Sequence, residues 1–219
     1  MNRAYFITGT DTEVGKTFVT CALLHRARAA GLRAAGIKAL AAGTDENGIN
    51  DDVDRIRRAA DVVLPDDILN PYCFAPAIAP HIAAAEAGVH IDFARIANAV
   101  AAARPQADLL LVEGAGGFRI PLGVDRDSAD LAVNLGLPVI LVVGMRLGCL
   151  NHALLTAEAI LARQLPLAGW VANTIDPGMS RFAENLASLR QWLPAPCLGV
   201  VPHRPDDPAA AADALVLPA

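Results

Sequence analysis

Short apolar runs alternate with longer helix-forming stretches along the whole chain. Six apolar runs predict strands at residues 4–8, 33–37, 109–112, 139–143, 169–172 and 198–201. The stretches between them predict helices at residues 16–30, 51–61, 93–103, 128–135, 151–164 and 179–192. Strands that are apolar on both faces and separated by helices are typical of a parallel sheet covered on each side. We therefore predict an α/β fold with a mostly parallel central sheet, flanked by helices on both faces.

Two segments lie outside this alternation. Residues 70–85 are rich in proline and alanine, and Pro71, Pro76 and Pro80 predict a shaped loop or the entry to a short helix. Residues 205–219 contain proline and aspartate followed by alanines, which predicts a loose helix at the surface. No linker, repeat or low-complexity segment divides the sequence, so we expect one domain over residues 1–219.

Composition argues against several classes of protein. Hydrophobic residues make up 54% of the chain and charged residues 19%, which argues against disorder. The net charge of −5 argues against nonspecific nucleic-acid binding. No apolar stretch approaches the roughly 20 residues of a membrane-spanning helix, and residues 1–5 lack the apolar region of a signal peptide. The four cysteines are scattered without a C-x-x-C pair. We expect a reduced, cytoplasmic protein without structural zinc, nucleic-acid partner or membrane partner.

The most informative motif, GTDTEVGKT at residues 9–17, joins the first predicted strand to the first predicted helix. In this arrangement the backbone N–H groups of the loop surround a phosphate, and the helix N-terminus adds the positive end of its dipole. Lys16 adds a full charge, and the Thr17 hydroxyl can reach Mg²⁺. Five residues separate Gly9 from Gly15, one more than in the general phosphate-loop pattern. The strand before the motif and the helix after it still predict a nucleotide-phosphate site.

Other polar side chains follow the remaining predicted strands. In an open parallel sheet, ligands bind beyond the carboxyl ends of the strands. Lys38 is either a second cation that faces the phosphates or a strand-end lysine that extends to solvent. Glu113 precedes a Gly-Ala-Gly-Gly turn, and it either holds Mg²⁺, directly or through water, or is a helix-capping or solvated residue. Asn173 can bind the edge of a base or can be an ordinary turn residue. Their convergence on one edge is stronger evidence for a ligand site than any one of them.

Further candidates lie at predicted helix starts. Asp51, Asp52 and Asp54 open a helix, where at least two of the three are expected to be only favourable first-turn acids. Residues 148–151 lead into another helix, either as an ordinary glycine turn or as a source of free N–H groups for a carboxylate. The histidines form no metal set: His25 and His90 are expected at the surface, and His81, His152 and His203 lack ligand spacing and are expected to be structural. No G-x-S-x-G or Cys/His nucleophile signature is present.

Seven segments match one enzyme family, in order, over most of the chain. They are YFITGTDTEVGKT (5–17), GIK (36–38), NPY (70–72), APHI (79–82), VEGAGG (112–117), VGMRLGCLNHA (143–153) and GWVAN (169–173). With these segments the chain resembles ATP-dependent dethiobiotin synthase, an enzyme of biotin biosynthesis. The five-residue spacing of the phosphate loop, which departs from the general pattern, is the form found in this family.

The resemblance implies the fold of the deviant phosphate-loop proteins and a homodimer with the substrate site near the subunit interface. It implies an ATP-dependent cyclo-ligase that carboxylates 7,8-diaminononanoate with CO₂ and closes the ureido ring, giving dethiobiotin, ADP and phosphate. A carbamate oxygen would attack the γ-phosphoryl group of ATP, and the second amine would close the ring on the mixed anhydride. Mg²⁺ is the implied cofactor and ATP the implied co-substrate.

The site residues of the family carry over onto the matching positions. Thr17, Asp52 and Glu113 would be the Mg²⁺ ligands, and Lys38 and Lys16 the catalytic cations. The residues implied to line ATP are Glu13, Val14, Gly15, Lys16, Thr17, Phe18, Asp52, Glu113, Gly114, Ala115, Gly116, Asn173, Thr174, Pro202, His203 and Arg204. The residues implied to hold the diamine are Thr12, Lys38 and Ala42, with Gly148, Cys149, Leu150 and Asn151 of the partner subunit.

The chain departs from the family in three places. Ala39 and Ala42 stand where the family commonly has Pro and Ser, which removes one hydroxyl from the substrate site. The loop over residues 44–51 is short, so the resemblance supports Asp52 less strongly than Thr17 and Glu113 as a metal ligand. Residues 202–204 diverge, so the resemblance does not fix the nucleotide preference.

Three other functions fit parts of the sequence. A ParA- or MinD-like ATPase switch would share the fold, but those proteins carry a lysine five residues before the loop lysine, where this chain has Asp11. A cobyrinate-type synthetase would need a glutaminase domain with a cysteine nucleophile, for which the sequence shows no candidate. A non-catalytic nucleotide-binding module is disfavoured by the intact Lys16, Thr17 and Glu113.

Overall fold

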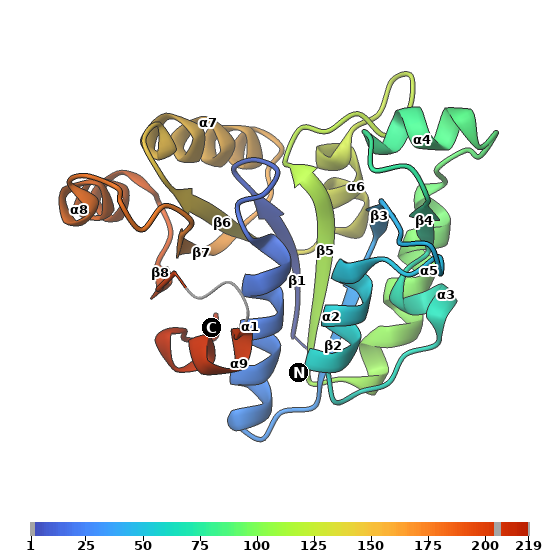
Figure 1. The fold of residues 1–219 in the computed structure, drawn as a ribbon, viewed down its shortest axis with the longest axis horizontal. Helices are drawn as coiled ribbons and strands as arrows, with labels where there is room; N and C mark the ends of the chain where they lie inside the picture. Colours follow the sequence, from blue (N-terminus) through green and yellow to red (C-terminus); the bar gives the residue numbers. More distant parts are fainter. Residues whose placement is uncertain (1–2, 204–206, 219) are drawn as a thin grey trace.

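Six parallel strands form the central sheet of the computed structural model, which describes residues 3–203 and 207–218 (Figure 1). From one edge to the other they are β2 (Ala34–Lys38), β5 (Leu109–Gly117), β1 (Arg3–Gly9), β6 (Val139–Met145), β7 (Leu167–Thr174) and β8 (Cys197–Val201). Every residue of β6 and all but the first of β1 are buried. The central strands therefore need cover on both faces.

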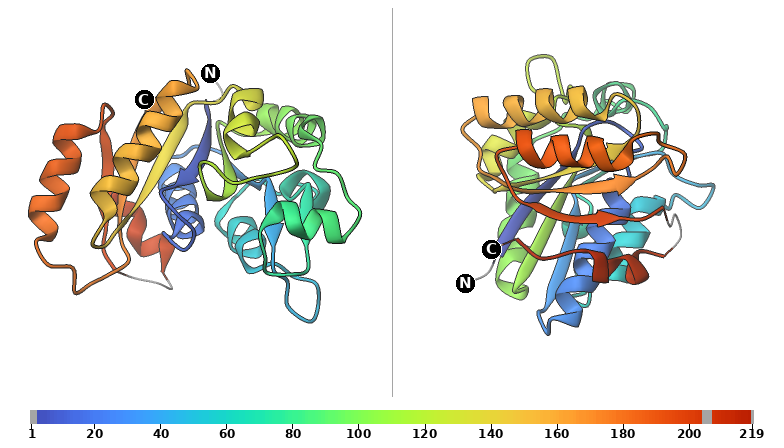
Figure 2. Two further views of the ribbon diagram at one scale, coloured as in Figure 1. Left: turned by 90° about the horizontal axis from the view of Figure 1, so that it is seen from above. Right: turned by 90° about the vertical axis from the view of Figure 1, so that its left-hand side faces the viewer.

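Helices supply this cover. The described helices are α1 (Lys16–Ala29), α2 (Asp51–Ala59), α3 (Asp66–Leu69), α4 (Pro80–Glu86), α5 (Phe93–Ala103), α6 (Ser128–Leu135), α7 (Cys149–Ala162), α8 (Phe182–Trp192) and α9 (Pro208–Ala211), with 3₁₀ turns η1 (Arg104–Gln106) and η2 (Ala212–Ala214). Figure 2 shows α1 and α9 on one side of the sheet, and α6 and α7 on the other. The predicted α/β fold with a parallel sheet covered on both faces is confirmed. Among the described helices, none is both long and apolar enough to cross a membrane.

A second, smaller sheet was not predicted. β3 (Leu40–Ala42) and β4 (Tyr72–Phe74) pair in parallel, so they bring together two segments that are far apart in the sequence. Strands of three residues are too short to show a hydrophobic period. The proline-rich segment also contains α4, with Pro80 in its first turn, where the missing N–H costs no helical hydrogen bond. Of the two predictions for this segment, the short helix is the one observed.

The prediction of a surface helix in the tail is confirmed by α9, but the helix is packed against the protein rather than loose. The described part of this tail forms α9 and η2, in which Ala211 and Ala212 are buried, and Leu215 beyond them is buried as well. These elements pack against α1, and the Val216 N–H donates a hydrogen bond to the Leu198 carbonyl at 2.8 Å. The alanines therefore serve close packing, which the sequence pattern alone did not distinguish from exposure.

Candidate active site

The phosphate loop, residues 10–15, connects β1 to α1 at the carboxyl edge of the sheet. The Asn173 amide, at the end of β7, donates to the Val14 carbonyl at 2.9 Å and so fixes the loop. Gly15 has φ 81°, and a Cβ there would lie 2.2 Å from Asn173 Nδ2, so this position requires glycine. No side chain caps the start of α1. Its first N–H groups are therefore available to an anion.

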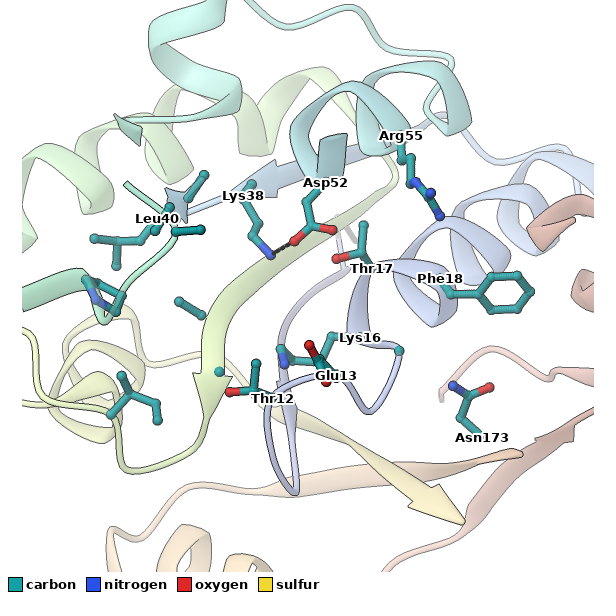
Figure 3. A pocket seen from close by; sticks show the side chains of 18 of the residues that line it. Thr12, Glu13, Lys16, Thr17, Phe18, Lys38, Leu40, Asp52, Arg55 and Asn173 are labelled. Atoms are coloured by element: carbon teal, nitrogen blue, oxygen red, sulfur yellow. Dashed lines mark hydrogen bonds and ion pairs between the residues drawn. The ribbon is translucent and has the colours of Figure 1, made fainter. Parts of the chain in front are cut away.

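A cavity of about 930 Å³ opens beside this loop (Figure 3). Most residues that the resemblance assigns to the nucleotide, or to the diamine in the same subunit, line this cavity. They are Thr12, Glu13, Gly15, Lys16, Thr17, Phe18, Lys38, Ala42, Asp52, Ala115, Gly116, Asn173, Thr174 and His203.

Lys38 ends β2 and is buried, with its side chain directed toward Asp52 (Figure 3). Its Nζ lies 2.7 Å from Asp52 Oδ2 and 2.6 Å from Glu113 Oε1. Burial alone would lower the pKa of Lys38, but the two carboxylates outweigh burial and hold the pKa above its ordinary value. Lys38 is therefore a charged group of the site, and the alternative prediction of a lysine that extends to solvent was wrong.

Glu113 is fully buried and lies within β5, which continues to Gly117. The predictions that a turn follows it directly, or that it is solvated, were wrong. Its Oε1 also accepts a hydrogen bond from Thr17 Oγ1 at 2.6 Å, and its Oε2 accepts one from Thr20 Oγ1 at 2.7 Å. Two hydroxyls and one ammonium thus satisfy a charge that burial would otherwise disfavour. Sequence reasoning missed Thr20, although it stands three residues after Thr17 on one helix face.

The three aspartates at the start of α2 differ in direction. Asp51 pairs with Arg55 at 2.7 Å, and Asp54 pairs with Arg58, each one turn further along the helix. Asp52 instead lines the cavity and contacts the Lys38 ammonium. Burial would raise the pKa of Asp52, but the lysine charge outweighs burial and holds the pKa below its ordinary value. Two of the three are therefore ordinary helix-start acids, as predicted.

Two asparagines hold these charged residues in place. Asn50 caps α2 by accepting the Val53 N–H at 3.2 Å, and its own amide donates to the Gly43 carbonyl at 2.6 Å. The Asn70 amide donates to the Lys38 carbonyl at 2.7 Å. The first asparagine positions the helix start that carries the cavity aspartate, and the second positions the end of β2.

The remaining wall of the cavity was not predicted. It is apolar except for one arginine, and it consists of Leu40, Ala41, Ala77, Ile78, Ala79, Pro80, Ile120, Ile175 and Arg55. Much of this wall is brought in by β3 and by the segment that follows β4. The matching APHI motif, which contains two of these residues, was the only signal of it in the sequence.

Some of the residues implied by the resemblance lie elsewhere. Val14, Glu113, Gly114 and Pro202 are not among the residues that line the cavity, and Arg204 lies outside the described part of the chain. Glu113 lies behind the wall, fully buried, and contacts the cavity residues Thr17 and Lys38. The residues at the start of α7 do not line the cavity of their own chain either; they are Gly148, Cys149, Leu150 and Asn151. Their role in a partner's site stays a prediction.

Comparisons with known proteins agree with this geometry. A family model described as an AAA domain matches residues 3–209. The chain is 59% identical to the ATP-dependent dethiobiotin synthetase BioD of Aromatoleum aromaticum, over 99% of this chain and 98% of that protein. It is 53% identical to the protein of the same name from Nitrosospira multiformis, over 93% of this chain and 89% of that protein.

Among solved structures, a ParA family ATPase from Chlorobium tepidum has a TM-score of 0.58 at 13% identity, over 97% of this chain and 90% of that one. MinD from Pyrococcus horikoshii, complexed with Mg-ADP, has a TM-score of 0.56 at 17% identity, over 98% of this chain and 87% of that one. These likenesses show the fold alone. The identities to the two synthetases, over nearly the full length, show more: the chain belongs to the ATP-dependent dethiobiotin synthetase family.

Proposed function

We propose that this protein closes the ureido ring of dethiobiotin from 7,8-diaminononanoate, CO₂ and ATP. The observation that carries the proposal is the 59% identity to a dethiobiotin synthetase over 99% of this chain. The cavity supports it, because the only two lysines of the sequence, Lys16 and Lys38, line the cavity beside a phosphate loop. Such a site suits the transfer of a phosphoryl group.

The reaction needs no nucleophilic side chain. One amine of the diamine adds CO₂ and loses a proton, which gives a carbamate. A carbamate oxygen attacks the γ-phosphorus while the bond to ADP breaks. The second amine then attacks the carbamoyl carbon of the mixed anhydride, inorganic phosphate leaves, and loss of a proton completes the cyclic urea. Negative charge builds on the transferred phosphoryl group, so placed cations and N–H donors supply the catalysis.

Two lysines from different elements would supply most of the positive charge. Lys16 opens α1, and its Nζ donates to the Asp11 carbonyl at 3.2 Å, so the ammonium stays within the loop. Lys38 comes from the end of β2. We assign Lys16 to the phosphates in the ground state, together with the loop N–H groups. We assign Lys38 to the γ-phosphoryl and carbamate oxygens as their charge develops.

The donor set beside Lys38 fits Mg²⁺. The carboxylates of Asp52 and Glu113 contact one ammonium, and the Thr17 hydroxyl donates to Glu113. Hard oxygen atoms of this kind are the ligands that Mg²⁺ prefers. Three protein groups are fewer than the octahedral shell needs, so nucleotide phosphates and water would complete it. When bound, Mg²⁺ would neutralise charge that develops on the phosphates.

We further propose a homodimer in which the start of α7 binds the substrate carboxylate of the partner subunit. In support, Gly148 begins this helix without a side-chain cap, so free N–H groups are available to an anion. The preceding Leu147 is 92% exposed. Lys38→Gln and Asn151→Asp homodimers should each be impaired, and mixing them should restore activity through one intact composite site. Mixed dimers that stay as impaired as the parents would contradict the shared site.

A turnover assay tests the main proposal. Phosphate release is measured with ATP and Mg²⁺, with and without the diamine and bicarbonate, and dethiobiotin is identified by mass spectrometry. We expect phosphate release to require both substrates and to match dethiobiotin formation. ATP hydrolysis at the same rate without the diamine would refute the proposal and would favour an ATPase switch.

A further inference from the structure

Arg55 lines the cavity but has no part in the site that the resemblance implies. It stands on α2 three residues after Asp52, so both side chains leave nearly the same face of the helix. Figure 3 shows its guanidinium directed toward Phe18, on the side of the cavity away from Lys38. The nucleotide cavity therefore has a third cationic side chain besides its two lysines.

Contacts within the protein leave much of this guanidinium available. Arg55 Nε lies 2.7 Å from Asp51 Oδ2, and within the described part of the chain the structure gives it no other ion pair. The Arg55 side chain is 45% exposed to solvent. A second cavity of about 380 Å³ is also lined by Arg55 and Phe18, so these two side chains separate the two spaces. The arginine has room to turn toward a ligand in the larger cavity.

The position of Arg55 along a bound nucleotide follows from α1. Lys16, Thr17 and Phe18 are successive residues in the first turn of this helix, where free N–H groups face an anion. Under the proposed function, Lys38 marks the end where the γ-phosphoryl group reacts, and Asn173 marks the end that holds the base. Phe18 follows Lys16 and Thr17 along α1, so its N–H and the guanidinium directed toward it would meet the nucleotide on the base side of the γ-phosphoryl group.

We propose that Arg55 binds the α-phosphate of ATP, and this rests on the proposed function as an ATP-consuming enzyme. A phosphate in this place would present oxygen atoms to a planar guanidinium, which suits paired hydrogen bonds to such oxygens. Asp51 pairs with Nε of the guanidinium and so competes with a phosphate for it. The α-phosphate is retained in ADP, so the contact stabilises bound nucleotide before and after phosphoryl transfer.

The test is titration calorimetry with Mg²⁺ and ADP on Arg55→Gln. We expect the Kd for ADP to rise about tenfold, which corresponds to about 1.4 kcal/mol. This is the scale of one charge-assisted contact at a partly exposed site. Arg58→Gln is a matched control, since Arg58 also pairs with an acid four residues earlier but lines only the second cavity. Its ADP affinity should equal that of the wild type.

Two further measurements separate a phosphate contact from other roles. With 2′-deoxy-ADP, Arg55→Gln should lose as much affinity as with ADP; a loss seen only with ADP would overturn the α-phosphate assignment in favour of the ribose. Asp51→Asn frees the guanidinium and should bind ADP at least as tightly as the wild type. A loss as large as that of Arg55→Gln would show that the ion pair acts through the structure of α2.

Two outcomes bear on the proposal as a whole. An equal effect of both arginine variants, or none, would overturn it. Dethiobiotin formation by the wild type is measured separately, so failure of the proposed function is distinguishable from failure of this contact.

Discussion

Replacing Lys38 with Gln removes a charge from the centre of the site while keeping one hydrogen-bond donor. Lys38 Nζ contacts Asp52 and the fully buried Glu113 at 2.7 and 2.6 Å. Breaking a buried ion pair by removing one partner costs about 3–5 kcal/mol. We expect the free energy of unfolding to fall by about 3 kcal/mol, at the lower end of this range, because the Thr17 and Thr20 hydroxyls still donate to Glu113.

The same substitution should act in opposite directions on catalysis and on metal binding. We expect kcat to fall on the order of 10²-fold, the typical effect of losing one placed electrostatic group. ATP affinity should change far less, because Lys16 and the loop N–H groups bind the ground-state phosphates. Lys38 also competes with Mg²⁺ for the carboxylates of Asp52 and Glu113. Its loss should therefore raise the Mg²⁺ affinity measured without nucleotide by roughly tenfold, which is about 1.4 kcal/mol.

Steady-state kinetics, calorimetry and denaturant unfolding on the same preparation measure these three effects. Because the sequence has only two lysines, selective isotope labelling of lysine gives one side-chain signal each for Lys16 and Lys38. The Lys38 signal should shift on addition of Mg²⁺. Lys16→Gln is the control: its ammonium donates to the Asp11 carbonyl and acts on Asp52 and Glu113 only through space, so this variant should lose nucleotide affinity and raise the Mg²⁺ affinity less than Lys38→Gln does. A near-normal kcat in Lys38→Gln, a rate loss explained by weaker ATP binding, or Mg²⁺ affinity that is not raised would refute the reasoning.

Three further results are expected. Thr17→Val and Glu113→Gln should each weaken Mg²⁺-dependent ADP binding, because each alters an oxygen ligand of a hard cation; calorimetry with and without Mg²⁺ checks this, and unchanged metal dependence in both would remove the metal assignment. Ala42→Ser should lower the KM for the diamine a few-fold without changing that for ATP, since it adds a hydroxyl to the cavity wall; an equal change in both would point to a general effect on the cavity. Burial raises the pKa of Cys21 to about 12, so at pH 8 its thiolate fraction is about 10⁻⁴; alkylation followed by mass spectrometry should label exposed Cys73 first and Cys21 only after unfolding.

The residues that sequence reasoning brought together are those at the ends of long apolar strands. β1, β2, β5 and β7 each show as an apolar run, and parallel strands must end at the same edge of their sheet. Lys38 and Glu113 could therefore be expected to meet although 75 residues separate them. Their direct contact could not be predicted, because it depends on β2 lying next to β5 and on the register that places Lys38 opposite Glu113.

The apolar wall of the cavity escaped prediction for a different reason. It depends on the pairing of Leu40 with Tyr72 and of Ala42 with Phe74, in strands of three residues each. Short strands carry no period, and their partner is chosen by tertiary packing. The sequence also did not show which of the three aspartates faces the cavity. The rotation of α2 about its axis decides this, and it selects Asp52.

The use of lysine and arginine in this cavity follows the different demands on each cation. Lys38 shares two carboxylates that would also bind Mg²⁺, so its charge must be able to leave them for the γ-phosphoryl group. An ammonium on a flexible stem can do this, because it is a point charge with rotatable donors, whereas a guanidinium would hold a carboxylate through two parallel bonds. Arg55 has the opposite task under the proposed α-phosphate contact, since that phosphate stays in place from ATP to ADP. The planar guanidinium of Arg55 suits a contact whose geometry does not change during the reaction. Lys38→Arg should on this reasoning lose activity despite keeping the charge, and Arg55→Lys should retain only part of the ADP affinity.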